Sequence, residues 1–112
     1  MGWANFEVLS HGKDLRSAYN NAVENARFEY GHDSYNGPIS TTSGVQLDLN
    51  APRYGTKAFD KYITRRFDKD NMPKYSCFAV ELTGKALKEY RQRHRLERKR
   101  IRVFYFYGLV GC

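Results

Sequence analysis

The sequence predicts a small α+β protein in which two or three helices pack on one face of a mixed or antiparallel sheet. Strand-like and helix-like segments alternate in the order β-α-β-α-β-(α)-β. With 112 residues and short strands, little chain is left to cover both faces of a parallel sheet. The sequence contains no internal repeat, linker or low-complexity tract, so residues 1–112 are predicted to form a single domain.

The first third of the chain predicts a strand and a long helix. The apolar run at residues 6–9 suits a first strand. From residue 15 to residue 30, apolar side chains recur every three or four positions, which places them on one helix face. Asp14 is a good N-cap for this helix, and Gly31 is a typical residue for its C-terminal end.

A polar connector at residues 31–38 separates this helix from the second strand region. Residues 39–42 and 45–49 alternate between apolar and polar side chains, as a half-buried strand does. Either one bent strand or a small hairpin fits this pattern.

The second half predicts another helix and two strands. Thr56 is an N-cap for a helix whose core face would contain four residues. These are Phe59, Tyr62, Ile63 and Phe67. Residues 75–82 and 101–110 are typical of strands, and both faces of the last one are aromatic or branched. We therefore expect the last strand inside the sheet, with one face against the helices and the other partly covered.

The net charge of +7 is concentrated in the segment from Gly84 to Arg102. This segment has nine Lys and Arg residues against Glu89 and Glu97, whereas the rest of the chain has equal numbers of cationic and acidic residues. Its few apolar residues are spaced by three or four, which favours a helix with a narrow buried stripe. A long β-hairpin is the competing interpretation.

So local a positive charge indicates a polyanionic partner. Arginines and lysines would follow a phosphate backbone, while Tyr90, His94 or the aromatic last strand would stack on bases. An acidic protein surface and a merely solvated helix face are the alternatives. The predicted polyanion-binding residues are Lys85, Lys88, Tyr90, Arg91, Arg93, His94, Arg95, Arg98, Lys99, Arg100 and Arg102.

The connector after the first helix is a second candidate site. A carboxylate, an imidazole and two phenols converge there, which suits a ligand-binding loop. Turn formation and the helix C-terminus explain the same residues without any ligand, so we assign no catalytic residue. The residues of this possible ligand loop are Tyr30, His32, Asp33, Tyr35 and Asn36.

Composition favours a cytoplasmic protein without a cofactor. No apolar run approaches the roughly 20 residues needed to cross a bilayer, and no signal-peptide pattern occurs. Cys77 lies in an apolar run typical of the core, and a disulfide with Cys112 is not expected in a reducing compartment. The three histidines lie in different elements, so we predict no metal site.

Two patches resemble a group of small proteins encoded by phages and mobile elements. One is Ala-Arg-Phe-Glu-Tyr-Gly at 26–31 followed by Tyr-Asn-Gly-Pro-Ile at 35–39, and the other is the segment 106–112. Together they cover about a fifth of the chain. Pro38, where the group has Thr, and the long basic segment depart from the pattern. The resemblance implies an inhibitor of a host defence system, such as an anti-CRISPR, that acts by binding.

These observations give three hypotheses. The first is a non-enzymatic, phage-encoded inhibitor that binds a nucleic acid, or a nucleic-acid-binding host effector, through the basic segment. The second is a stand-alone nucleic-acid-binding module. The third is a small enzyme or nucleotide-binding protein centred on His32, Asp33 and Tyr35. The sequence leaves the oligomeric state open.

Overall fold

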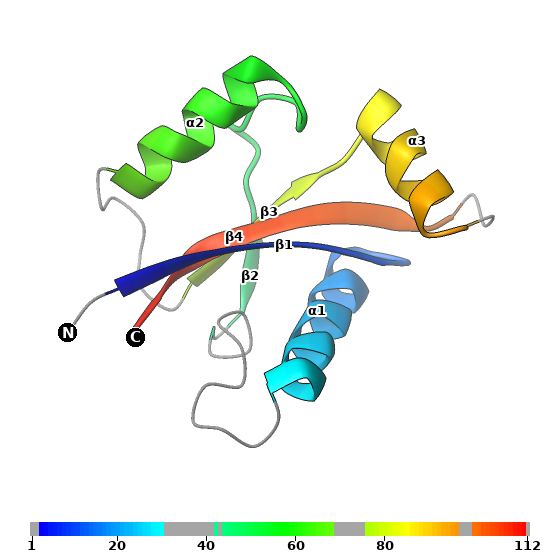
Figure 1. The fold of residues 1–112 in the computed structure, drawn as a ribbon, viewed down its shortest axis with the longest axis horizontal. Helices are drawn as coiled ribbons and strands as arrows, with labels where there is room; N and C mark the ends of the chain where they lie inside the picture. The colour runs from blue at the N-terminus through cyan, green and yellow to red at the C-terminus, as the bar shows by residue number, and fades with distance from the viewer. Residues whose placement is uncertain (1–2, 31–41, 43, 69–75, 97–99, 112) are drawn as a thin grey trace.

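The computed structural model describes residues 3–30, 42, 44–68, 76–96 and 100–111. Within them the elements follow the predicted order, and the third helix is present (Figure 1). The predicted α+β class is thus confirmed, and residues 84–93 form a helix rather than a hairpin. The elements are β1 (Trp3–Gly12), α1 (Leu15–Tyr30), β2 (Val45–Leu47), α2 (Lys57–Asp68), β3 (Ser76–Glu81), α3 (Gly84–Arg93) and β4 (Arg102–Gly111).

The described strands form one mixed sheet in the order β1-β4-β3-β2. β4 is antiparallel to both β1 and β3, and the short β2 is parallel to β3. The β1–β4 ladder is continuous from Trp3 opposite Gly111 to Gly12 opposite Arg102. The last strand therefore lies inside the sheet, as its sequence indicates.

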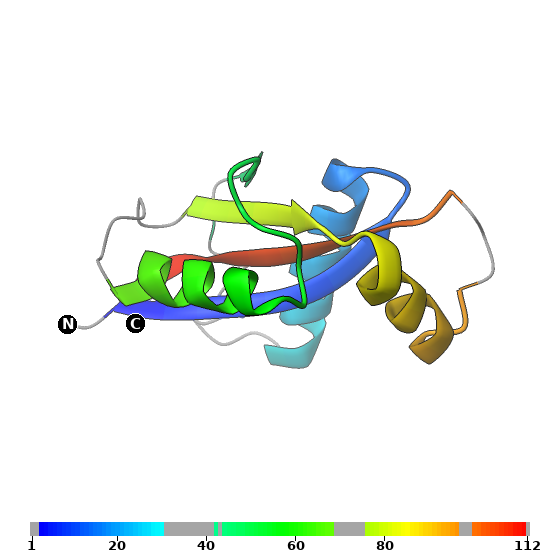
Figure 2. The same ribbon diagram turned by 90° about the horizontal axis from the view of Figure 1, so that it is seen from above.

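The helices cover both faces of the sheet, so the prediction of helices on one face is wrong. α1 lies on one side, and α2 and α3 lie together on the other (Figure 1). The view from above agrees, with α2 and α3 in front of the sheet and α1 behind it (Figure 2).

The side chains of β4 explain this arrangement. Every residue from 103 to 109 is buried. Phe104 and Phe106 belong to the apolar cluster that contains Ala18, Tyr19 and Ala22 of α1. The alternate β4 residues belong to the cluster beneath α2 and α3, and they are Val103, Tyr105, Tyr107 and Leu109. Helices on one face alone would leave one of these two aromatic rows in water.

Two helix starts form as their sequences predict. Asp14 Oδ1 accepts a hydrogen bond of 2.8 Å from the N–H group of Ser17, in the first turn of α1. Thr56 Oγ1 accepts one of 3.1 Å from the N–H group of Phe59 in α2. Each cap satisfies a backbone donor that has no partner within its own helix.

Close packing at the centre of the sheet requires glycine at position 108. A Cβ atom there would lie 2.2 Å from the carbonyl oxygen of Ser76 and 2.8 Å from Cε1 of Phe6. Cys77, on the neighbouring strand, is buried and free of any disulfide. Burial raises the pKa of its thiol to about 12, and Cys77 is a core residue, as predicted.

Candidate polyanion-binding surface

Helix α3 has a buried stripe and a charged outer face. Tyr90 is buried, and Ala86 and Leu87 pack partly buried against the same apolar cluster. Lys85 and Lys88 are exposed on the outer face. This is the narrow-striped helix that the spacing of its apolar residues predicts.

Two of the predicted binding arginines make internal contacts. Arg91 Nη2 donates a 2.7 Å hydrogen bond to the carbonyl oxygen of Ile101, where the chain returns to β4. Arg102 donates two hydrogen bonds of 2.8 Å to the two carboxylate oxygens of Glu81 on β3. These hydrogen bonds lower the pKa of Glu81 and raise that of Arg102. Arg102 is thus engaged in a bidentate ion pair between neighbouring strands.

The other described cations of the segment face solvent. Lys85 lies 3.9 Å from Glu89, with both side chains highly exposed, so this pair contributes little. The remaining ones are exposed and form no ion pair with a carboxylate among the residues that the structure describes. They are Lys88, Arg93, Arg95 and Arg100. Arg98 and Lys99 lie outside the described residues.

The basic segment has one buried aromatic ring, Tyr90, and one exposed ring, His94. Tyr90 is only 8% exposed, and Tyr105 and Tyr107 on β4 are buried as well. These three phenols therefore present no open ring face to a base. His94 is exposed and stacks on Tyr90, with 4.1 Å between the ring centroids.

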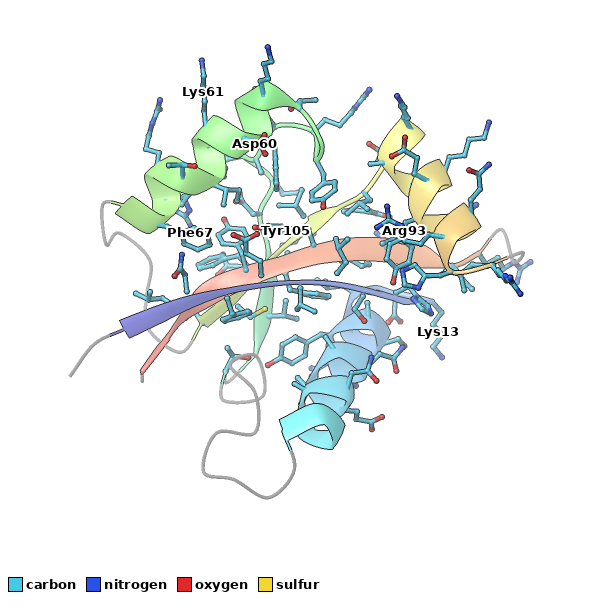
Figure 3. The ribbon with its side chains drawn as sticks, in the orientation of Figure 1. Lys13, Asp60, Lys61, Phe67, Arg93 and Tyr105 are labelled. Carbon is cyan, nitrogen blue, oxygen red and sulfur yellow. The ribbon has the colours of Figure 1, made fainter. Side chains whose placement is uncertain are left out.

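Helix α2 adds cations to the same side of the molecule. Lys57, Lys61 and Arg65 are exposed on it, beside the acidic Asp60. Figure 3 shows Lys61 pointing away from the sheet, while Tyr105 points from the sheet toward α2 and α3. Sequence reasoning missed this contribution, because cationic and acidic residues balance when they are counted over the whole chain outside the basic segment.

The loop before α2 connects the two helices into one surface. A Cβ atom on Gly84, the first residue of α3, would lie 3.9 Å from Nη1 of Arg53. A Cβ atom on Gly55 would lie 3.9 Å from Cβ of Ala86. The cations of α2, of this loop and of α3 lie on the same side of the sheet (Figure 1), and we call this surface the α2/α3 face.

A shallow groove of about 450 Å³ runs beside α3. The groove combines cationic and amide groups with apolar side chains. Such a lining suits a ligand that carries both negative charges and flat or apolar groups. Its lining residues are Gly84, Leu87, Lys88, Arg91, Gln92 and Leu96.

A second polar cluster lies between α2 and the sheet, and no local sequence pattern indicates it. Oδ2 of Asp48 accepts hydrogen bonds from the hydroxyl groups of Tyr62, at 2.8 Å, and Tyr107, at 2.5 Å. The guanidinium carbon of Arg66 lies 5.9 Å from the centroid of the Tyr107 ring. Burial, followed by the bond to Asp48, raises the pKa of both tyrosines, which keeps them neutral at physiological pH. This cluster is suited to joining elements rather than to proton transfer.

The predicted ligand loop stays a prediction. Tyr30 is the last residue of α1, and His32, Asp33, Tyr35 and Asn36 lie outside the described residues. Among the residues that the structure describes, no three histidine, cysteine or acidic side chains are grouped so as to hold a metal ion. The described helices include none that is long and apolar enough to span a membrane.

Comparisons with protein-family models, with curated proteins and with solved structures found no match to this chain.

Proposed function

We propose that this protein binds nucleic acid through the α2/α3 face and acts by binding rather than by catalysis. The observation that carries the proposal is the concentration of exposed cations on this face, from two helices that are separate in sequence. Lys57, Lys61, Lys88 and Arg95 are exposed there without an ion pair to a carboxylate among the described residues. Such an arrangement is typical of surfaces that contact several phosphates.

Counterion release gives the proposal a quantitative form. Four phosphate contacts to a single strand or a duplex correspond to a loss of roughly 50- to 150-fold in affinity between about 50 and about 200 mM salt. A catalytic pocket for a small neutral ligand would show no such dependence.

Within this proposal, the narrower role is a phage-encoded, stoichiometric inhibitor of a host defence system. It is supported by the resemblance at residues 26–39 and 106–112 and by the polyanion-binding character of the surface. Such an inhibitor would work in the host cytoplasm on a nucleic acid or on the effector that carries one. A stoichiometric inhibitor abolishes the effector's activity only when the two proteins reach a fixed molar ratio. An enzyme would abolish that activity at a much lower ratio, because it turns over. Affinity capture from a bacterial lysate, with and without nuclease treatment, separates a nucleic-acid partner from a protein partner.

Charge-reversal variants with equal change in net charge test the surface. Lys57→Glu/Lys61→Glu alters α2, and Lys88→Glu/Arg95→Glu alters α3. The matched control, Lys13→Glu/Arg16→Glu, replaces two exposed cations outside α2 and α3, one between β1 and α1 and the other in the first turn of α1. Affinity for a labelled oligonucleotide, measured by fluorescence anisotropy, is expected to fall at least about tenfold further in the first two variants than in the control. Equal losses in all three would mean that net charge alone governs binding, and an absence of binding at low salt would refute the proposal.

A further inference from the structure

Three aromatic rings form a triangular cluster where the end of β1 meets the end of α3. Nδ1 of His11 and the hydroxyl group of Tyr90 are 2.9 Å apart and share a hydrogen bond. The Tyr90 ring in turn stacks on His94, with an angle of 28° between the ring planes. The centroids of the two imidazoles are 6.2 Å apart.

Tyr90 and His11, the two inner members of this cluster, are held by several contacts. Tyr90 is buried in the cluster beneath α3. The carbonyl oxygen of His11 accepts a 2.8 Å hydrogen bond from Nδ2 of Asn21, which ties the end of β1 to α1. Tyr90 therefore offers His94 a buried and hydrogen-bonded support.

The backbone also holds His94 in place. Its N–H group donates a 3.0 Å hydrogen bond to the carbonyl oxygen of Tyr90, and it is the C-cap residue of α3. Arg95 follows in the left-handed conformation, with φ of 54°, and this sharp turn ends the helix. Leu96 N then donates to the carbonyl oxygen of Arg91 at 2.9 Å, which closes the turn.

His94 is thus an exposed ring with one face supported and with cations on both sides in the sequence. Arg93 and Arg95 are exposed next to it, and neither pairs with a carboxylate among the described residues. A flat ring flanked by cations combines the two contacts that single-stranded nucleic acids use, namely base stacking and phosphate neutralisation. A duplex keeps its base faces covered by the neighbouring base pairs, so it gains nothing from such a ring.

We infer that the ligand of the α2/α3 face is single-stranded nucleic acid and that one unpaired base stacks on His94. This inference rests on the proposed function, because it names the class of nucleic acid that the same face takes. It also assigns the three rings separate roles. His94 contacts the base, whereas Tyr90 and His11 position His94.

The test compares ligands that share a backbone charge but differ in their bases. Labelled single strands of about 12 nucleotides, as DNA and as RNA, are compared with an abasic DNA strand and a duplex of the same length. Anisotropy gives the affinity of each for the wild type, His94→Ala and His94→Phe. The two variants replace an exposed side chain, and thermal unfolding checks that their folds are intact.

The wild type is expected to bind the base-bearing DNA strand about tenfold more tightly than the abasic strand, the range of one stacked base. His94→Ala should lose this preference with an unchanged salt dependence, and His94→Phe should keep it. If the wild type binds the abasic strand or the duplex as tightly as the base-bearing strand, or if His94→Ala keeps the preference, the stacking inference is refuted while the proposed function stands. If no nucleic acid binds at low salt, the stacking inference and the proposed function are both refuted. The RNA strand shows which of the two sugars the face favours.

Discussion

The hydroxyl group of Tyr107 donates a 2.5 Å hydrogen bond to Oδ2 of Asp48, which joins the central strand to the segment after β2. The same oxygen accepts a hydrogen bond of 2.8 Å from the hydroxyl group of Tyr62 in α2. Oδ1 of Asp48 accepts a hydrogen bond of 3.0 Å from the N–H group of Asn50. One carboxylate therefore connects a strand, a helix and a loop.

Removing the buried hydroxyl should weaken this junction. Hydrogen bonds to a carboxylate contribute roughly 1.5–3 kcal/mol, so Tyr107→Phe is expected to lower the free energy of unfolding by about that amount. Tyr62→Phe is the comparison, because Tyr62 is half-buried and water can replace its hydroxyl group. Urea denaturation measures both, and a loss in Tyr107→Phe no larger than in Tyr62→Phe would contradict the role given to this bond.

The buried face of α1 should tolerate no charge. Ala22 is 2% exposed in the cluster that contains Phe104 and Phe106. Ala22→Asp buries an unpaired carboxylate, at a cost of several kcal/mol in a domain whose total stability is roughly 5–15 kcal/mol. The control is Asn25→Asp, which places the same side chain on the exposed face of α1. Thermal unfolding should show loss of cooperative unfolding for Ala22→Asp, and an unchanged melting temperature would show that this face is not in the core.

The first two helices were predictable because their signals are local. The sequence predicts α1 over residues 15–30, and the structure has it at Leu15–Tyr30, since Asp14 and the apolar spacing lie within the helix or beside it. The same holds for α2 after Thr56. Such signals act over one or two helical turns and need no knowledge of the fold.

Half of the candidate surface was not predictable, because it depends on contacts between distant residues. Nothing near Asp48 in sequence indicates a bond to Tyr107, which lies on the last strand. The cations of α2 have acidic neighbours in the chain, and only the fold sets them beside α3. The apolar character of both faces of β4 does indicate helices on both sides of the sheet. The one-face prediction instead followed from the short length of the chain, which left few residues to cover a second face.

The free energy of unfolding should depend on pH through His11. Burial, and then the neighbouring His94, lower the pKa of His11 from its ordinary value of 6.5. The unfolded chain therefore takes up a proton at higher pH than the folded protein, so stability is full above 6.5 and falls as the pH drops through that value. Tyr90 and His94 are the titratable groups that contact His11.

Urea denaturation at about pH 7.5 and about pH 5.5 tests this linkage. The wild type is expected to lose stability at the lower pH. His11→Gln, which has no proton to take up in this range, is expected to lose less. Equal losses in the two proteins would assign the pH dependence to other groups.

Cys77 should react only when the protein opens. Its thiol is 1% exposed, and burial raises its pKa to about 12, so thiolate is scarce at neutral pH. In a Cys112→Ser variant, labelling by a disulfide reagent is expected to be roughly a hundredfold slower in native buffer than in denaturant. Rapid labelling in native buffer would show that the core beside β3 opens readily.

The central position of β4 determines when the sheet can form during synthesis. β4 pairs with β1 on one side and with β3 on the other, yet it is the last of these strands to leave the ribosome. Until residues 102–111 emerge, β1 lacks its partner strand β4, and Phe104 and Phe106 are not yet present to pack on the rings of their cluster. Helix α1 can form early, but the sheet closes only after translation has passed β4, by contacts that are distant in sequence and slow to form. The newly made chain therefore exposes the strand 3–12 until β4 has been made, and this interval is when the strand is most open to aggregation or to capture by a chaperone.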